Sequence, residues 1–285
     1  MTNPTPIYTS NQADPAYCLR FSWTGFPSGR FFTGLPSPEL LHEIAPLWEE
    51  DGIRLLENYW SDEKIQLTFS TKPAVSPVVI AQRAKGRVQY ALRKANTPQK
   101  FSKKLSIRSV GNNTTKDVTE YIRSQVENET YIDPKFAQKM RQMTVIDPTV
   151  DLSIPSRSAH GRYWYNLHVV LVTAERHNVF DIDALELTRD GCFRIANRKL
   201  YRLSGVSVMP DHLHLALRGD YNKSPEEIAL EFKNNLAFLH GQQAIWNSGF
   251  YVGTFGEYNM QAIRNNASPQ LTVVGSSRVD RRRAV

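Results

Sequence analysis

Closely spaced apolar residues between Val206 and Leu217 predict a β-strand. Pro210 lies within this run and has no backbone N–H, so we expect an edge or a bulge where the strand begins. Two histidines, His212 and His214, stand two residues apart in the second part of the run. Because residues i and i+2 of a strand project to the same face, both imidazoles can reach one metal ion.

The predicted elements repeat along the chain in the same order. Helices are expected to open at Ser76-Pro77 and at Ser224-Pro225, each with serine as the N-cap and proline at the first helical position. Both continue as Ser-Pro-x-x-Ile-Ala-x-x-x-Lys, which indicates an internal duplication. Further matched positions are Tyr17-x-Leu19 with Tyr165-x-Leu167, Val110-Gly111 with Phe255-Gly256, and Gln125 with Gln270.

The duplication predicts the α+β fold class, with two tandem domains that are each an antiparallel sheet with helices packed on one face. The first domain is expected at residues 13–130 and the second at residues 158–275. Residues 131–157 contain three prolines and are interpreted as a linker, and residues 276–285 as a basic tail.

The charge of the chain points to a polyanionic partner. The formal net charge is +7, and the sequence between Glu63 and Asp117 contains no acidic residue. A solvated face would mix charges of both signs, so we interpret this segment as a phosphate-contacting surface. Its candidate DNA-binding residues are Arg83, Lys85, Arg87, Arg93, Lys94, Lys103, Lys104 and Arg108.

Other properties of the sequence narrow the class of protein. No apolar run approaches the roughly 20 residues that a membrane-spanning helix needs, and the first residues lack the apolar core of a signal peptide. Two cysteines, Cys18 and Cys192, cannot form a disulfide framework. We therefore expect a cytoplasmic protein with no membrane partner.

Residues 163–270 resemble the single-tyrosine HUH transposases of the insertion-sequence type. The similar segments are Leu167–Thr173, Val208–Leu215, and Trp246–Gly256, which precedes the tyrosine helix in that family. The resemblance implies two ferredoxin/RRM-like HUH domains, a bound Mg²⁺ or Mn²⁺, and association with the nucleoid while the protein acts on single-stranded DNA. It also implies a helix that ends in Tyr-x-x-x-Gln, in which tyrosine is the nucleophile and glutamine is a third metal ligand.

The second copy lacks this nucleophile. Its tyrosine position is Asn266, which cannot form a covalent phosphodiester intermediate, and Pro269 would distort the helix. The first copy has Tyr121 and Gln125 at the required i, i+4 spacing, on one face of a predicted helix. The nucleophile is therefore expected in the first copy, whereas the histidines belong to the second copy.

The first copy in turn lacks the histidines, because Lys64 and Gln66 occupy the corresponding positions. We predict one composite site, as in a fused dimer whose tyrosine helix docks against the histidine strand of the other copy. The protein would then be a monomeric pseudo-dimer or a homodimer. In this site Tyr121 is the catalytic residue, and the metal ligands are His212, His214 and Gln125.

Other interpretations remain open. A protein derived from such a transposase could bind DNA hairpins through the acid-free segment without catalysis, and an RRM-like RNA binder is a third possibility. Tyr258 is an alternative nucleophile near the start of the second tyrosine helix. Asp211 could orient a histidine ring as an outer partner. The remaining histidines, which we expect to have no catalytic role, include His168, His177 and His240.

Overall fold

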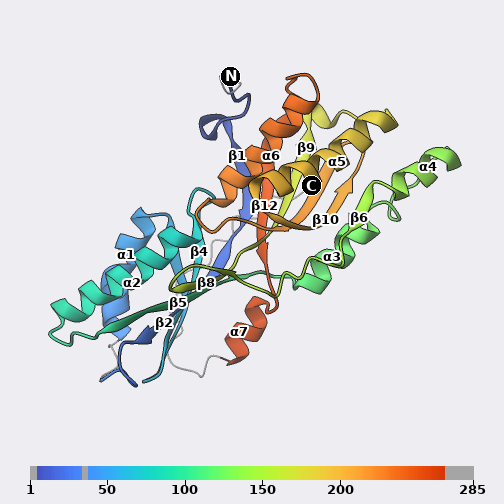
Figure 1. Cartoon of the computed structure of the whole chain (residues 1–285). Coiled ribbons are helices and arrows are strands. Elements are labelled where there is room, and N and C mark those ends of the chain that lie inside the picture. The colour runs from blue at the N-terminus through green and yellow to red at the C-terminus, as the bar shows by residue number, and fades with distance from the viewer. Residues whose placement is uncertain (1–4, 34–37, 267–285) are drawn as a thin grey trace.

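The structure, a computed structural model, describes residues 5–33 and 38–266, and these form two six-stranded sheets (Figure 1). The first-half sheet consists, in spatial order, of β3 (Ile53–Trp60), β4 (Ile65–Thr71), β2 (Arg20–Pro27), β5 (Phe101–Val110), β8 (Gly161–Trp164) and β7 (Ser156–Arg157). The second-half sheet consists of β1 (Asp14–Cys18), β12 (Trp246–Phe255), β9 (Asn166–Thr173), β11 (His212–Arg218), β10 (Arg202–Val208) and β6 (Thr144–Ile146).

Helices cover the sheets in a matching arrangement. On the first-half sheet, α1 (Pro38–Glu50) and α2 (Pro77–Lys94) lie side by side, and α5 (Ile182–Lys199) and α6 (Pro225–Leu239) lie in the same way on the second-half sheet (Figure 1). Each half ends in a shorter helix, α3 (Thr115–Ser124) or α7 (Met260–Asn266). The order strand, strand, helix, strand, strand, helix, strand, helix therefore occurs twice, and the predicted α+β fold class is confirmed.

The two long helices that open with Ser-Pro begin where the sequence predicts. The Ser76 hydroxyl accepts a hydrogen bond from the Val79 N–H, and Pro77 occupies the first turn of α2. Ser224 caps α6 in the same way and forms a reciprocal capping box with Glu227. These caps satisfy backbone donors that a helix start would otherwise leave unpaired.

Each half contributes its first strand to the sheet of the other half. Only Leu19 separates β1 from β2, yet β1 pairs in parallel with β12 in the second-half sheet. Likewise only Tyr165 separates β8 from β9, and β8 pairs in parallel with β5 in the first-half sheet. The strands within each half pair antiparallel, as predicted, and the one parallel neighbour of each sheet comes from the other half.

The two exchanged strands cross at a tightly packed junction. The Ser109 hydroxyl donates to the Phe255 carbonyl at 2.6 Å, and the Thr254 hydroxyl donates to the Val110 carbonyl at 2.7 Å. A Cβ atom at Gly111 would meet the backbone carbonyl oxygen of Thr254, so the backbones approach too closely there for a side chain. Buried side chains of both halves form one large hydrophobic cluster, and a smaller cluster at the junction joins Val118 and Ile122 to Phe255.

The segment predicted as one strand from Val206 to Leu217 is instead a hairpin, so that prediction was wrong. β10 ends at Val208 and β11 begins at His212, and the Met209 N–H donates to the His212 carbonyl at 2.8 Å across the turn. Pro210 lies in this turn, where its missing N–H removes no bond from the sheet.

Regular structure also occurs within the predicted linker. Residues 131–157 include α4 (Pro134–Arg141) and β6, and β6 pairs antiparallel with β10.

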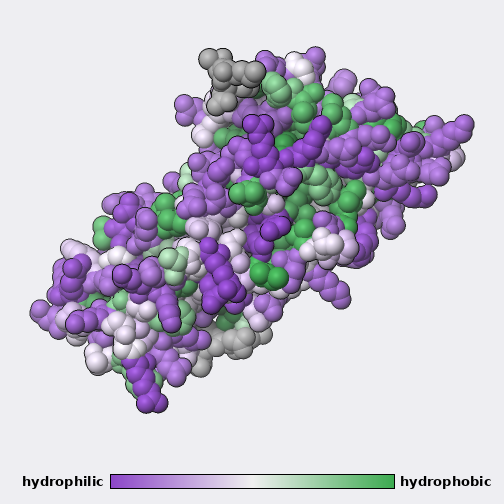
Figure 2. Space-filling model, viewed as in Figure 1, coloured by the Kyte–Doolittle hydropathy of each residue, from purple (hydrophilic) through white to green (hydrophobic). Residues whose placement is uncertain are grey.

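The molecular face in Figure 2 is mostly hydrophilic, with small scattered apolar groups. Among the described residues, no helix has the length and apolar character that crossing a membrane requires.

Candidate functional site

The two histidines of the Pro-Asp-His-Leu-His segment lie in the middle of the second-half sheet. β11 carries them between β9 and β10, so the histidine strand is an inner strand of this sheet. His214 is buried with 3% of its surface exposed, and His212, at the start of the strand, is partly exposed. Their ring centroids are 4.8 Å apart, with the ring planes nearly perpendicular.

Hydrogen bonds engage the Nδ1 atom of each of these histidines. The Asp211 carboxylate lies 2.5 Å from His212 Nδ1, which is the bond expected of an outer partner. The His168 Nε2 atom lies 3.1 Å from His214 Nδ1. When Nδ1 carries the proton, Nε2 presents a lone pair, which is the usual state of a metal-bound imidazole.

His214 Nε2 is a buried nitrogen with no hydrogen-bond partner among the described residues. A buried nitrogen without a partner is costly unless something else satisfies it. The donor type and the burial of this atom therefore fit a divalent metal. Within residues 5–33 and 38–266, however, no three His, Cys, Asp or Glu side chains come together as a metal-binding group.

Burial keeps the inner histidines neutral. Removal from water lowers the pKa of His168 to about 4. The pKa of His214 lies well below its ordinary value because of burial and, to a smaller extent, the charges of His168 and His212. A neutral imidazole is the form that can bind a metal at neutral pH.

Helix α3 of the first half brings Tyr121 to these histidines. A capping box between Thr114 and Asp117 starts the helix, and the buried face of the helix packs beside β6, β10 and β11. The Tyr121 ring lies 5.3 Å from the His214 ring and meets it edge-on, with 49% of the residue exposed. The structure thus brings together a tyrosine and a histidine that come from different halves of the chain.

Gln125 lies one turn beyond Tyr121, at the C-cap of α3. Its Nε2 atom donates to the Tyr121 carbonyl oxygen at 2.9 Å, within its own helix. Among the described residues, no hydrogen bond joins Gln125 to a histidine. The structure therefore places Gln125 on the correct helix but does not show it directed at the two histidines.

Sequence reasoning gave no role to His168, which the structure places in this cluster. His168 lies on β9, and its ring is stacked on His214 and also contacts the ring of Tyr121, at 5.7 Å. The sequence signal was the polar residue in the apolar strand 166–173, but its meaning depends on the pairing of β9 with β11. His240 lines a smaller cavity that His212 also lines, and its Nε2 lies 2.8 Å from the Thr188 hydroxyl.

The predicted DNA-binding residues are not one continuous unpaired surface. Arg83 and Arg87 on α2 form ion pairs with Asp51, and Lys94 pairs with Glu43, so acids from outside the acid-free segment neutralise them. Two more residues of α2 bond to backbone carbonyls, Lys85 to Ser102 at 2.8 Å and Arg93 to Gln89 at 3.3 Å. Lys103 and Lys104 on β5 are exposed to solvent.

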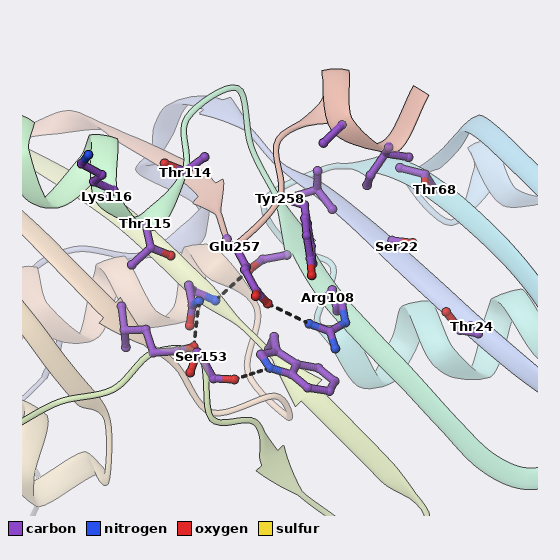
Figure 3. A pocket seen from close by; sticks show the side chains of 18 of the residues that line it. Ser22, Thr24, Thr68, Arg108, Thr114, Thr115, Lys116, Ser153, Glu257 and Tyr258 are labelled. Carbon is purple, nitrogen blue, oxygen red and sulfur yellow. Dashed lines mark hydrogen bonds and ion pairs between the residues drawn. The ribbon is translucent and has the colours of Figure 1, made fainter. Parts of the chain in front are cut away.

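Arg108, also on β5, is separate from that helix. Its guanidinium lies 3.5 Å from the centre of the Trp164 ring and 3.7 Å from the Glu257 carboxylate (Figure 3). Both Arg108 and the alternative nucleophile Tyr258 line a large cavity over the first-half sheet. Tyr258 therefore shares a cavity with Gln66 of the first half, on the sheet that has no histidine pair. The side chain of Asn266 and the residues Pro269 and Gln270 lie outside the described part, as does the basic tail 276–285.

Residues 162–266 match the family of IS200-like transposases. Among solved structures, a candidate transposase from Deinococcus radiodurans is 24% identical over 35% of this chain and 85% of its own, with a TM-score of 0.29. A bacterial light-regulated adenylyl cyclase is 11% identical over 83% of this chain and 72% of its own, with a TM-score of 0.22. A VAO-type flavoprotein from Myceliophthora thermophila is 12% identical over 82% of this chain and 39% of its own, with a TM-score of 0.18. No curated protein matches the chain.

Proposed function

Because residues 162–266 carry an IS200-like transposase domain, we propose that this protein cleaves and rejoins single-stranded DNA through a composite active site. The family supports a role in transposition and DNA recombination. The finer elements of the proposal are the single-stranded substrate, the tyrosine nucleophile and the divalent metal. The partner would be single-stranded DNA with hairpin-forming ends, bound where the nucleoid offers it.

One observation carries the proposal, namely the contact between Tyr121 of the first half and His214 of the second half. Their rings meet at 5.3 Å although neither half contains both residues. A nucleophile beside a pair of imidazoles with free Nε2 atoms is the combination that attack on a phosphodiester needs. The exchange of β1 and β8 supports a rigid relation between the halves, which a shared site requires.

In the proposed site, some residues bind the metal and others position the metal ligands. His212 and His214 would hold a Mg²⁺ or Mn²⁺ through Nε2, with the Gln125 amide oxygen as third ligand after a rotation of its side chain. When bound, the metal neutralises charge on the non-bridging oxygens of the scissile phosphate. Two imidazoles and an amide form a neutral ligand set, so the ligands do not cancel that charge. Asp211 and His168 hold the two rings in position.

Tyr121 acts as the nucleophile in this proposal. Its phenolic oxygen loses its proton and forms a bond to phosphorus, while the bond from phosphorus to the 3′ oxygen breaks. The departing 3′ oxygen takes up a proton, which leaves a 5′-phosphotyrosine and a free 3′-OH. Attack by a 3′-OH on that phosphotyrosine later restores a phosphodiester and releases the tyrosine.

A covalent-adduct assay tests the proposal. Full-length protein is incubated with Mn²⁺ and labelled single-stranded hairpin DNA, and denaturing gels are examined for a protein–DNA band. We expect a band with the wild type, no band with Tyr121→Phe, and an undiminished band with Tyr258→Phe. A band that persists in Tyr121→Phe would refute the assignment of the nucleophile.

The same assay addresses the alternative of a hairpin-binding protein without catalysis. The hydrogen bond of Gln125 within its own helix favours that alternative, because it leaves the third ligand undirected. In that case the hairpin would bind and shift on a native gel, while no denaturation-resistant band would form with any metal. The exposed Lys103 and Lys104 would then be the first residues to substitute in the binding measurement.

A further inference from the structure

We propose that the cavity over the first-half sheet, referred to as the vacated site, binds unpaired nucleotides of a DNA strand and does not cut them. The choice of DNA as ligand rests on the proposed function, but the cavity itself does not. It has a volume of about 1060 Å³ and lies between the first-half sheet, α7, the start of α3 and the loop at residues 146–153 (Figure 3). This volume is slightly above the usual range of small-molecule sites, which suits a short stretch of strand.

Strand register shows that the vacated site corresponds to the histidine site. Gln66 is opposite Thr24 in the first-half sheet, as His214 is opposite Val170 in the second. On the other side, Thr24 is opposite Ser106 and Val170 is opposite Tyr251. The residues of the vacated site that replace His212, His214 and His168 are therefore Lys64, Gln66 and Ser22.

These replacements remove metal binding and retain positive charge. A protonated lysine has no lone pair, so Lys64 cannot ligate a metal where His212 can. An ammonium group at this position can contact a phosphate directly. Among the described residues Lys64 has no ion pair, and its Nζ lies 5.4 Å from the centre of the Tyr59 ring. The vacated site can therefore hold a backbone phosphate without activating it.

Aromatic rings line the same cavity and offer platforms for unpaired bases. Trp164 is held by a hydrogen bond from its Nε1 to the Ser153 carbonyl at 2.5 Å, and Arg108 covers one face of the ring (Figure 3). Tyr258 also lines this cavity and is half-exposed. Stacking on aromatic side chains binds every base, because each base has a flat π-face.

A buried acceptor in the cavity has no partner. Asn166 is buried, its Nδ2 donates to the Leu152 carbonyl at 3.3 Å, and its Oδ1 has no hydrogen-bond partner among the described residues. Asn166 lines the vacated site, so an amino group of a base can satisfy this oxygen. A pocket for free phosphate alone would not require such an acceptor.

Acidic residues in the lining limit where phosphates can lie. Asp147 accepts hydrogen bonds from Thr149, Asp151 accepts one from the Ser153 N–H, and Glu257 pairs with Arg108. The hydrogen bonds from Thr149 and Ser153 lower the pKa of Asp147 and of Asp151, so the strand should place its phosphates near Lys64 and Lys116 and its bases toward the aromatic rings. We therefore expect binding with a weak dependence on salt and a clear dependence on base stacking.

Photocrosslinking in EDTA tests the inference without the metal-dependent reaction. Single-stranded oligonucleotides containing 5-iododeoxyuridine are irradiated with the full-length protein, and crosslinked peptides are identified by mass spectrometry. We expect crosslinks at Tyr59, Trp164 or Tyr258. Crosslinks confined to Tyr121, Tyr251 or surfaces outside the cavity would overturn the inference.

Binding affinities in EDTA provide the second measurement. We expect Tyr258→Ala to weaken oligonucleotide binding at least about fivefold, because one stacked base is lost. Lys64→Ala should reduce the slope of log affinity against log salt by about 0.7, the value for one phosphate contact of a single strand. Lys135→Ala, an exposed lysine on the remote helix α4, is the matched control and should change the affinity less than twofold (Figure 1). Equal effects of Lys64→Ala and Lys135→Ala would refute a specific role for the cavity.

The two proposals can fail separately. If the wild type forms no covalent adduct but crosslinks at Tyr258, the proposed reaction is wrong and the binding inference stands. If the adduct forms through Tyr121 while the cavity gives no crosslink, the reaction stands and the inference is wrong.

Discussion

His168 should control how tightly the histidine site binds metal, although it is not expected to touch the metal itself. The substitution His168→Phe keeps a ring of similar size against Tyr121 and His214 but removes the Nε2 atom that bonds to His214 Nδ1. His214 is then left with a buried nitrogen that no longer has its partner.

The size of the effect follows from that lost hydrogen bond. A buried polar group without its partner costs about 1–3 kcal/mol, and about 1.4 kcal/mol corresponds to a factor of ten in an equilibrium constant. Without this bond the His214 ring is no longer held in the orientation and tautomer that metal binding requires, so metal binding becomes weaker. Substitution of such outer partners typically lowers metal affinity 10–100-fold, and we expect a loss within that range.

Calorimetric titration of the DNA-free protein with Mn²⁺ measures this affinity directly. His168→Gln can still offer an amide to His214 Nδ1 and should recover part of the affinity lost in His168→Phe. His240→Phe is the matched control, because it removes a histidine hydrogen bond to Thr188 that does not involve His214. His240→Phe should lower the melting temperature and leave the Mn²⁺ affinity within twofold of the wild type.

An unchanged Mn²⁺ affinity in His168→Phe would show that the reasoning about His168 is wrong. An equal loss in His168→Phe and His240→Phe would also refute it, because the effect would then reflect general destabilisation. Partial rescue by glutamine separates positioning of His214 from simple packing.

Two further predictions concern stability. The pKa of His168 is lowered to about 4 in the folded protein. Its contribution to the free energy of unfolding is therefore fully present above about pH 6.5 and is lost as the pH falls from there towards 4, by at most about 3 kcal/mol. Urea unfolding at pH 7.5 and 4.5 should show a larger loss of this free energy in the wild type than in His168→Phe, and equal losses would contradict this. Gly111→Ala places a Cβ against the backbone at Thr254 and should lower the free energy of unfolding by about 2 kcal/mol or more, whereas Gly86→Ala on α2 meets no neighbour within 4 Å and should raise it by about 0.5–1 kcal/mol.

Local signals in the sequence predicted the duplication and the helix starts well. Ser76-Pro77 and Ser224-Pro225 act through capping and a fixed φ, which depend only on nearby residues. The correspondence of Lys64 with His212 also follows from sequence, and the strand registers agree with it. The match of Tyr17-x-Leu19 with Tyr165-x-Leu167 was wrong by two residues, because the strand registers make Thr24 equivalent to Val170 and therefore Leu19 equivalent to Tyr165.

Features that depend on neighbours distant in sequence could not be predicted. The alternation of side chains in β1 and β8 is the same whichever sheet a strand joins, so the exchange leaves no signal in the pattern. The same limit applies to His168, whose partner His214 becomes visible only when β9 and β11 are paired. The hairpin around Pro210 was misread because a short apolar run on each side of a turn resembles one longer strand.

The exchanged strands make the covalent link between the halves largely unnecessary for their association. β1 completes one sheet and β8 completes the other, so separation of the halves would expose the edges of both β12 and β5. A chain cleaved in the largely exposed segment at residues 148–151 should therefore remain one particle, because each fragment supplies a strand to the sheet of the other. Neither half has a complete sheet on its own. A gene fragment that encodes one half should therefore yield a protein that forms a homodimer.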